Sequence, residues 1–312
     1  MFELIRWKFQ IISKLVGISE AIRLILVLIK LKLINLIPTF SIFTKYIFTK
    51  QIISKSPTLK NTYNLKFYRN MSTNNNNKED LAFRQWLAGL IDGDGYFLLS
   101  KNGYNSCEIT MDARDKKVLY LIQHKYGGSI KEVSNANAFK YKLRNKTGLI
   151  ALINDINGLI RNPTRLLQMN KLCVKFNIEL KYPGNLTFND GWLSGFIDSD
   201  GSIYYSESSG QVFISLSQKN KYLLEPLINI YGGRVDISSP KIEAFKYVVY
   251  RKIELFNLID NYFSKYPLRT EKMKRVNLIK QFYLLRLYRK SEDIVKFNEW
   301  VKFKDKWEKY QD

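Results

Sequence analysis

Two spacings of apolar side chains alternate along the chain, and together they predict an α+β fold. Apolar residues at every third or fourth position predict helices, and short runs of alternating apolar and polar residues predict strands. Asn102-Gly103 predicts a hairpin turn, and Gly127-Gly128 predicts a helix end. Short antiparallel strands of this kind form a sheet with one face on the helices and the other face open. The expected order is helix, strand, strand, helix, strand, strand, helix, helix, over residues 81–92, 96–100, 106–111, 115–126, 129–133, 138–144, 147–159 and 164–176.

This unit occurs twice. The decapeptide WLAGLIDGDG of residues 86–95 returns as WLSGFIDSDG at residues 192–201, and the AFKY of residues 138–141 returns unchanged at residues 244–247. A Tyr-Gly-Gly and a Pro-x-Arg tripeptide are repeated in the same order, and all offsets lie between 104 and 106 residues. We therefore expect two repeats that pack about a pseudo-twofold axis. The predicted division is a basic leader and Asn-rich linker, two repeats and a helical tail, over residues 1–78, 79–185, 186–290 and 291–312.

The two decapeptides also carry the candidate chemistry. Small side chains let two helices approach closely, which predicts that the motif helices pack on one another through Ala88, Gly89, Ser194 and Gly195. Each decapeptide ends in Asp-x-Asp-Gly, which places carboxylates at the negative end of a helix dipole. Two such ends side by side would repel one another unless divalent cations lay between them. A plain helix stop is the alternative interpretation, whereas an EF-hand is excluded because its further ligands are missing at the required spacing.

The charge balance favours a polyanionic partner. The 312 residues include 50 Lys+Arg and 28 Asp+Glu, which gives a formal net charge of +22. This excess favours nucleic acid as the partner, and a role in solubility alone is the alternative. The 46% of hydrophobic residues can bury a core, which excludes a disordered polycation. One His and two Cys exclude a Cys/His metal cluster and a disulfide scaffold.

The first 70 residues hold +10 of this charge, because they contain 12 Lys+Arg and only two acidic residues. Their longest uninterrupted apolar run, residues 24–29, is far shorter than the roughly 20 residues that span a bilayer, so we expect no stable transmembrane span. A basic, amphipathic segment is typical of a mitochondrial presequence or a membrane-surface helix, and a leader translated in frame is the alternative. The abundance of Ile, Asn, Lys and Tyr suggests an A+T-rich gene, which is consistent with a mitochondrial location.

The two decapeptides resemble the signature of the LAGLIDADG homing endonucleases and the related intron maturases, in the form that carries both motifs on one chain. The resemblance covers about residues 81–290. It implies a monomer whose two antiparallel sheets form a saddle in successive major grooves of double-stranded DNA. It also implies that the last Asp of each motif, Asp94 and Asp200, binds Mg²⁺ or another divalent cation such as Mn²⁺. Asp92 and Asp198 would then have a supporting, second-shell or capping role.

A basic residue near each metal site assists catalysis in the families that the chain resembles. Its position maps to Lys272 in the second repeat and to Gln168 in the first, with Arg165 and Lys171 nearby. A glutamine at this position departs from the family pattern and predicts a weaker first site.

The expected strands suggest where nucleic acid would be read. Lys140, Lys142 and Arg144 alternate with apolar residues, so one face of the sheet is basic and the other can pack on helices. The equivalent face of the second repeat has only Lys246, so the predicted target is long and asymmetric. The remaining candidate readers of bases or phosphates are Asn105, Asn135, Asn137, Gln211, Gln218 and Lys219.

Two functions from different classes fit these features. The first is a metal-dependent double-strand DNA endonuclease that leaves 3′ overhangs and spreads its own intron. The second is a maturase that binds and stabilises a folded group I intron RNA and needs no metal. Retention of both Asp94 and Asp200 favours the endonuclease, whereas Gln168 leaves the maturase open, and one protein can do both.

Overall fold

The computed structural model describes residues 78–239 and 244–310. These residues belong to a compact unit that begins at Asn76. Residues 1–77 of the predicted leader and linker, with the basic amphipathic segment and the asparagines at 74–77, lie outside the described residues, whereas Lys78, its predicted last residue, is helical. In the described part of the chain, no helix is both long and apolar enough to cross a membrane.

The first repeat has the predicted order of elements. It opens with the first motif helix, residues 78–94, which passes directly into strand β1. The elements that follow are β1 (Gly95–Leu99), β2 (Asn105–Asp112), η1 (Ala113–Asp115), α5 (Lys116–Tyr126), β3 (Ser129–Glu132), β4 (Ala138–Leu143), α6 (Lys146–Ile156) and α7 (Pro163–Phe176). The positive φ of Gly127, 76°, ends α5 where the sequence predicted it.

The second repeat has the same plan and ends with one further α-helix, residues 294–308. Its motif helix is α8 (Trp192–Asp200), which passes directly into β5. The elements that follow are β5 (Gly201–Ser206), β6 (Gln211–Gln218), η2 (Lys221–Leu223), α9 (Glu225–Tyr231), β7 (Arg234–Ser239), β8 (Ala244–Val249), α10 (Lys252–Asn257), η4 (Leu258–Tyr262), α11 (Lys272–Leu285), η5 (Tyr288–Lys290) and α12 (Ile294–Glu308).

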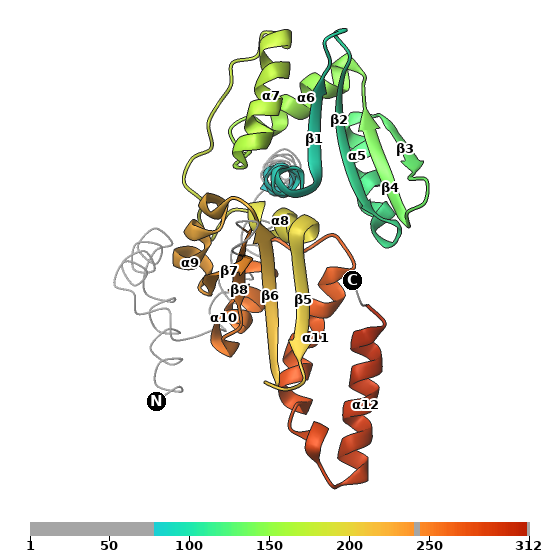
Figure 1. Ribbon diagram of the computed structural model, residues 1–312, viewed down its shortest axis with the longest axis vertical. Helices are drawn as coiled ribbons and strands as arrows, with labels where there is room; N and C mark the ends of the chain where they lie inside the picture. The colour runs from blue at the N-terminus through green and yellow to red at the C-terminus, as the bar shows by residue number, and fades with distance from the viewer. Residues whose placement is uncertain (1–77, 240–243, 311–312) are drawn as a thin grey trace, which may run out of the picture. The chain divides into compact units, whose positions relative to one another are not determined.

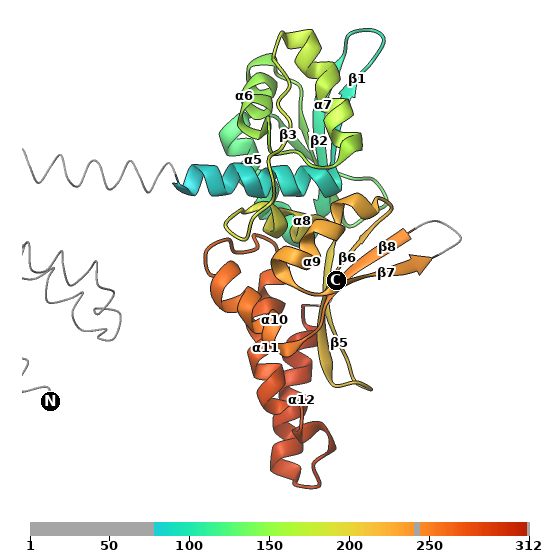
Figure 2. The ribbon, with the colours of Figure 1, turned by 90° about the vertical axis from the view of Figure 1, so that its left-hand side faces the viewer.

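Each repeat forms one antiparallel four-stranded sheet. The strand orders are β1-β2-β4-β3 and β5-β6-β8-β7 (Figure 1). The helices of each repeat lie on one side of its sheet (Figure 2). The apolar face of β4 follows the predicted alternation, because Tyr141 and Leu143 are fully buried. Each sheet therefore covers its helices with one face and leaves the other face open, as the sequence pattern predicted.

Helix α12 corresponds to the predicted helical tail, but it belongs to the core of the second repeat. Trp300, Phe303 and Trp307 are at most 5% exposed and pack around Phe282 of α11. Figure 1 shows α11 and α12 side by side. The second repeat thus has a larger aromatic core than the first.

The two motif helices pack through their small residues, as predicted. A Cβ added to Gly89 would lie 2.0 Å from the carbonyl oxygen of Trp192, and one added to Gly195 would lie 1.7 Å from that of Trp86. Ala88 and Ser194 are also buried at this contact. Only glycine allows the two backbones to come this close.

Candidate active site

Reciprocal hydrogen bonds join the two repeats just below the ends of the motif helices. The indole N–H of Trp86 donates to Asp198 across 2.8 Å, and the indole N–H of Trp192 donates to Asp92 across 2.7 Å. Each repeat therefore supplies one donor and one acceptor to the other. All four side chains are buried.

Asp92 and Asp198 also accept backbone N–H groups of the segments that lead into α7 and α11. Asp92 accepts the N–H groups of Arg161 and Asn162 at 2.7 and 3.0 Å. Asp198 accepts that of Arg269 at 2.8 Å. Burial raises the pKa of Asp92 to about 7 and also raises the pKa of Asp198, and the donors at each carboxylate oppose this rise. The inner acid of each motif therefore fixes the position of the chain that carries the basic residues.

Asp94 and Asp200 lie together at the ends of the two motif helices. A Cβ added to Gly93 would meet Asp200 Oδ2 at 2.8 Å, so the second carboxylate lies directly against the first helix end. Burial, and after it the charge of Asp200, raises the pKa of Asp94 to about 6. Burial also raises the pKa of Asp200, against the opposing effects of Lys272 and Gln218. The packing of the helices thus brings two negative charges together, with Asp200 partly buried and Asp94 more exposed.

Lys272 and Arg165 hold the carbonyl ends of the motif helices beside this carboxylate pair. Lys272 Nζ donates to the carbonyl oxygens of Ile197, Asp198 and Ser199 at 3.0–3.1 Å. Arg165 Nη2 donates to that of Gly93 at 3.0 Å. Cations are favoured at this end of a helix. Both side chains lower the pKa of both Asp94 and Asp200, so the two charges lie within electrostatic reach of the pair.

This arrangement makes Arg165 the structural counterpart of Lys272. Gln168, which the sequence comparison aligned with Lys272, instead accepts the backbone N–H of Phe97 on β1 at 3.2 Å. The repeated Pro-x-Arg tripeptide matched Arg165 with Arg269, but the fold does not follow this match. Arg161 occupies the position beside Asp92 that Arg269 occupies beside Asp198. The structure therefore brings a basic residue to both motif ends and places Gln168 on the neighbouring strand.

Gln218, like Arg165, is a neighbour of the carboxylates that the sequence did not predict. The sequence suggested it as a reader of nucleic acid, but its side-chain amide donates to Asp200. Gln218 pairs with Phe245 across the sheet, and in the first repeat Met111 pairs with the matching Phe139. The two halves of the site therefore differ: the second has Lys and Gln, and the first has Arg and Met.

The donors at the site suit a hard divalent cation. Carboxylate oxygens are the ligands that Mg²⁺ and Mn²⁺ prefer, and the mutual repulsion of Asp94 and Asp200 would be relieved by such an ion. Among residues 78–239 and 244–310, no three Asp, Glu, His or Cys side chains are close enough to form a metal site by themselves. Any ion held by this pair therefore needs further oxygen ligands, which substrate phosphates and water can provide.

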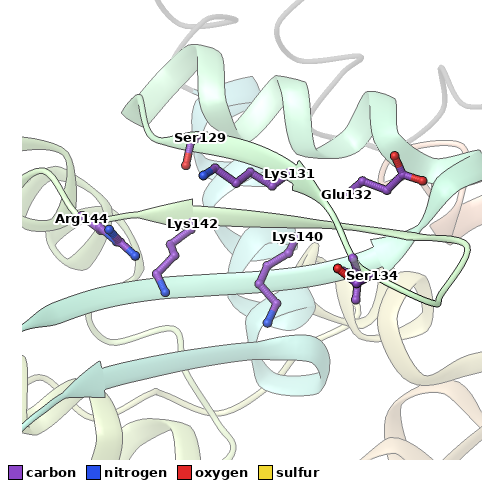
Figure 3. A pocket seen from close by; sticks show the side chains of 8 residues that line it. Ser129, Lys131, Glu132, Ser134, Lys140, Lys142 and Arg144 are labelled. Atoms are coloured by element: carbon purple, nitrogen blue, oxygen red, sulfur yellow. The ribbon is translucent and has the colours of Figure 1, made fainter.

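The open face of the first sheet has a basic hollow of about 400 Å³, which lies along β3 and β4. Figure 3 shows the side chains of Lys140 and Lys142 extending to the same side of β4. Both lie near one acid on the adjacent strand, because Glu108 is 2.6 Å from Lys142 Nζ and 3.9 Å from Lys140 Nζ. The residues that line the hollow are Ser129, Lys131, Glu132, Val133, Ser134, Lys140, Lys142 and Arg144.

The other predicted readers are distributed over both sheets. Asn105 accepts from Lys175 Nζ at 2.7 Å, and Lys246 Nζ donates to the hydroxyl of Tyr204 at 3.2 Å. The remaining ones lie in exposed or partly exposed positions at the turns and strand ends and are Asn135, Asn137, Gln211 and Lys219. Within the described residues, none of them makes a hydrogen bond or ion pair to Asp94 or Asp200.

The sequence profile of the LAGLIDADG endonucleases matches residues 87–173 and 193–283, one match in each repeat. The chain belongs to this family. It is 40% identical over 272 residues to the intron-encoded RNA maturase bI4 of Saccharomyces cerevisiae, a match that covers 83% of this chain and 42% of the maturase. It is 37% identical over 234 residues to the intron-encoded DNA endonuclease ai2b of Dictyostelium discoideum, which covers 72% of this chain and 88% of the endonuclease.

A third relative is the probable intron-encoded endonuclease aI2 of Debaryomyces hansenii, 35% identical over 77% of this chain and 39% of the relative. The chain thus spans about two-fifths of the length of the maturase and of this endonuclease. Among solved structures, the I-LtrWI LAGLIDADG homing endonuclease bound to target DNA superposes with a TM-score of 0.55 at 21% identity, covering 75% of this chain and 100% of that one. This likeness establishes the LAGLIDADG fold with its two repeats.

Proposed function

We propose that the chain is a site-specific, divalent-metal-dependent double-strand DNA endonuclease that promotes homing of the intron that encodes it. The observation that supports this most strongly is the meeting of Asp94 and Asp200, one from each repeat, beneath the cations of Lys272 and Arg165. Relatives named as intron-encoded endonucleases, and the fold of enzymes solved on target DNA, support the same reaction. In this proposal the chain acts as a monomer in the mitochondrion.

Each side chain of the site has a task in this proposal. Asp94 and Asp200 hold Mg²⁺ or Mn²⁺, which when bound supplies Lewis-acid activation of water and stabilisation of the leaving 3′ oxygen. Gln218 orients the Asp200 carboxylate through its amide. Lys272 and Arg165 place positive charge beside the scissile phosphates. The two halves of the site cut opposite strands and leave short 3′ overhangs.

The open faces of the two sheets bind the DNA on either side of the site. Lys140, Lys142 and Arg144 contact phosphates or bases in one half-site, and Lys246 does so in the other. The remaining predicted readers, Asn105, Asn135, Asn137, Gln211 and Lys219, contribute from the turns and strand ends. Because the two faces carry different residues, the target is long and asymmetric.

Cleavage by the full chain tests the proposal. The substrate is DNA that spans the intronless insertion site, with Mg²⁺ or Mn²⁺ present. We expect Asp94→Asn and Asp200→Asn to abolish cutting while binding persists, because both substitutions keep the shape of the side chain and remove its charge. Asp112→Asn is the matched control, since this carboxylate pairs with Arg114 at 2.9 Å instead of facing Asp94. Failure of the wild type to cut with any divalent cation would remove the endonuclease.

The second candidate function is a maturase that binds the host group I intron RNA. It is favoured by one observation, the 40% identity with a relative named as an RNA maturase over 83% of this chain. Splicing of the host intron in the presence of the Asp94→Asn and Asp200→Asn variants separates the two functions. If the chain is a maturase, both variants support splicing as the wild type does. If it is only an endonuclease, splicing is supported by neither the wild type nor the variants.

A further inference from the structure

The open face of the second sheet carries a row of three aromatic rings, which we call the aromatic row: Tyr204, Phe213 and Tyr250. Tyr204 on β5 stacks on Phe213 of β6 with ring centroids 5.2 Å apart and planes at 15°. Phe213 stacks on Tyr250, which follows β8, at 6.4 Å and 25°. A cation closes each end, because Lys246 Nζ lies 5.0 Å from the centre of the Tyr204 ring and the Arg234 guanidinium lies 4.6 Å from that of Tyr250.

The aromatic row faces away from the helices. Val212 and Ile214 flank Phe213 in the chain, and both are at most 1% exposed in the core of the repeat. Alternation along a strand then puts Phe213 on the opposite face. All three rings of the row are partly exposed.

The first sheet has no such row at the corresponding positions. Tyr204 pairs with Phe213 across the second sheet, and in the first sheet the corresponding pair is Leu98 and Ser106. The repeated AFKY segments place Arg144 where the second repeat has Tyr250. The first sheet therefore has no stacked rings at these positions and carries the charge of Arg144 there, whereas the second sheet has three aromatic rings in a row.

The way the rings stack limits what they can recognise. Phe213, the middle ring, has a stacked neighbour on each side, so its free surface is mainly its edge and it offers little ring face for an unpaired base to stack on. The edge of Phe213 has only C–H groups and cannot read the donors and acceptors of base pairs, and the hydroxyl of Tyr204 is already engaged by Lys246 Nζ at 3.2 Å. The apolar group that the major groove presents is the 5-methyl group of thymine. At a rise of about 3.4 Å per base pair, the row is long enough to meet about three consecutive base pairs.

We propose that the aromatic row reads thymine methyl groups, so that the half-site bound by the second repeat is a run of A·T pairs. Lys246, at one end of the row, then lies at the flanking phosphate backbone. The first repeat reads its half-site by hydrogen bonds and charge instead. The inference rests on the proposed function, because it requires this face of the sheet to meet double-stranded DNA.

Deoxyuridine tests the inference, because it removes the methyl group of thymine and leaves every hydrogen bond in place. The full chain is first used to select duplexes from a randomised pool without divalent metal, and the selected site is then remade with deoxyuridine at individual thymines. We expect about fourfold weaker binding for each methyl group lost within one half-site, and no such loss in the other. Phe213→Gln should abolish this dependence, whereas Tyr96→Gln, at the exposed aromatic ring of β1, should keep it.

The outcomes of these measurements separate three statements: the thymine-reading role, DNA binding as such, and an RNA-binding role of the aromatic row. Unchanged affinity of the wild type after every deoxyuridine replacement overturns the thymine-reading role, and this comparison needs no variant to fold. A pool that yields no enriched sequence at all contradicts the DNA-binding function instead. Binding of the intron RNA that depends on Phe213, with no deoxyuridine effect on DNA, overturns the inference by assigning the row to RNA.

Discussion

The contact between the motif helices gives the sharpest test of the fold. Gly195→Ala adds one methyl group at a position where it would lie 1.7 Å from the carbonyl oxygen of Trp86, and ordinary van der Waals contact begins at 3.4 Å. The nearest atoms belong to backbone, which cannot rotate away, so the two helices must move apart by more than an ångström. Overpacking of this kind costs about 3 kcal/mol, and the gain in helix propensity from Gly to Ala offsets about 1 kcal/mol of it. We expect a net loss of about 2 kcal/mol in the free energy of unfolding.

Denaturant unfolding of the full chain measures this loss, with Gly184→Ala as the matched control. A Cβ at Gly184 meets nothing within 4 Å, so its unfolding midpoint should stay close to that of the wild type. Gly89→Ala, on the facing helix, should cost about as much as Gly195→Ala. The double variant should lose less than the total of the two, because one separation of the helices relieves both contacts. A Gly195→Ala protein as stable as the wild type would refute the close packing of the motif helices.

Three further predictions concern the interface, the site and the first sheet. Trp86→Phe removes the indole donor of buried Asp198 and should lower the free energy of unfolding by about 1.5–3 kcal/mol, whereas Trp300→Phe, in the α12 core, should cost less. Gln218→Met copies Met111 of the first repeat and should slow cleavage of one DNA strand by about 10- to 100-fold, measured as accumulation of nicked plasmid; equal slowing of both strands would contradict separate half-sites. Burial alone would raise the pKa of Glu108, but Lys142, Ser106 and Lys140 together outweigh it and hold that pKa below the usual 4.5. The charged Glu108 therefore stabilises the fold above pH 4.5, and this contribution is lost as the pH falls through the lower folded value. Glu108→Gln should therefore reduce stability by about 1 kcal/mol or less at pH 7 and by less as the pH falls below 4.5, as thermal unfolding at a series of pH values would reveal.

The order of elements and the meeting of the motif helices could be predicted from the sequence, because both depend on local signals. Apolar spacing, the glycines of the turns and the small residues at Gly89 and Gly195 act within a few residues or through a simple repeat. The strand bounds differ from the predicted ones by one or two residues, which is the normal fraying of element ends. The segments around the starts of α7 and α11 were harder to match, since there the two repeats no longer keep the offset of 104 to 106 residues.

The counterpart of Lys272 shows this difficulty. Matching the two Pro-x-Arg tripeptides predicted that Gln168 is the counterpart of Lys272. The hydrogen bonds to the ends of the motif helices instead identify Arg165 as that counterpart. No local pattern reveals which side chain reaches a helix end some 70 residues earlier in the chain. The aromatic row was equally hidden, because its members come from three separate segments and become neighbours only through the register of the sheet.

The reciprocal hydrogen bonds between the repeats have a consequence for assembly. Trp86 and Asp92 give the first repeat both a donor and an acceptor, and Trp192 and Asp198 give the second repeat the same pair. Each surface is therefore complementary to a copy of itself as well as to its partner, as in an isologous dimer. A single repeat expressed alone retains the glycine, the indole and the carboxylate that such a dimer requires. The covalent link between the repeats then matters less for joining them than for ensuring that two unlike halves, and not two identical ones, meet.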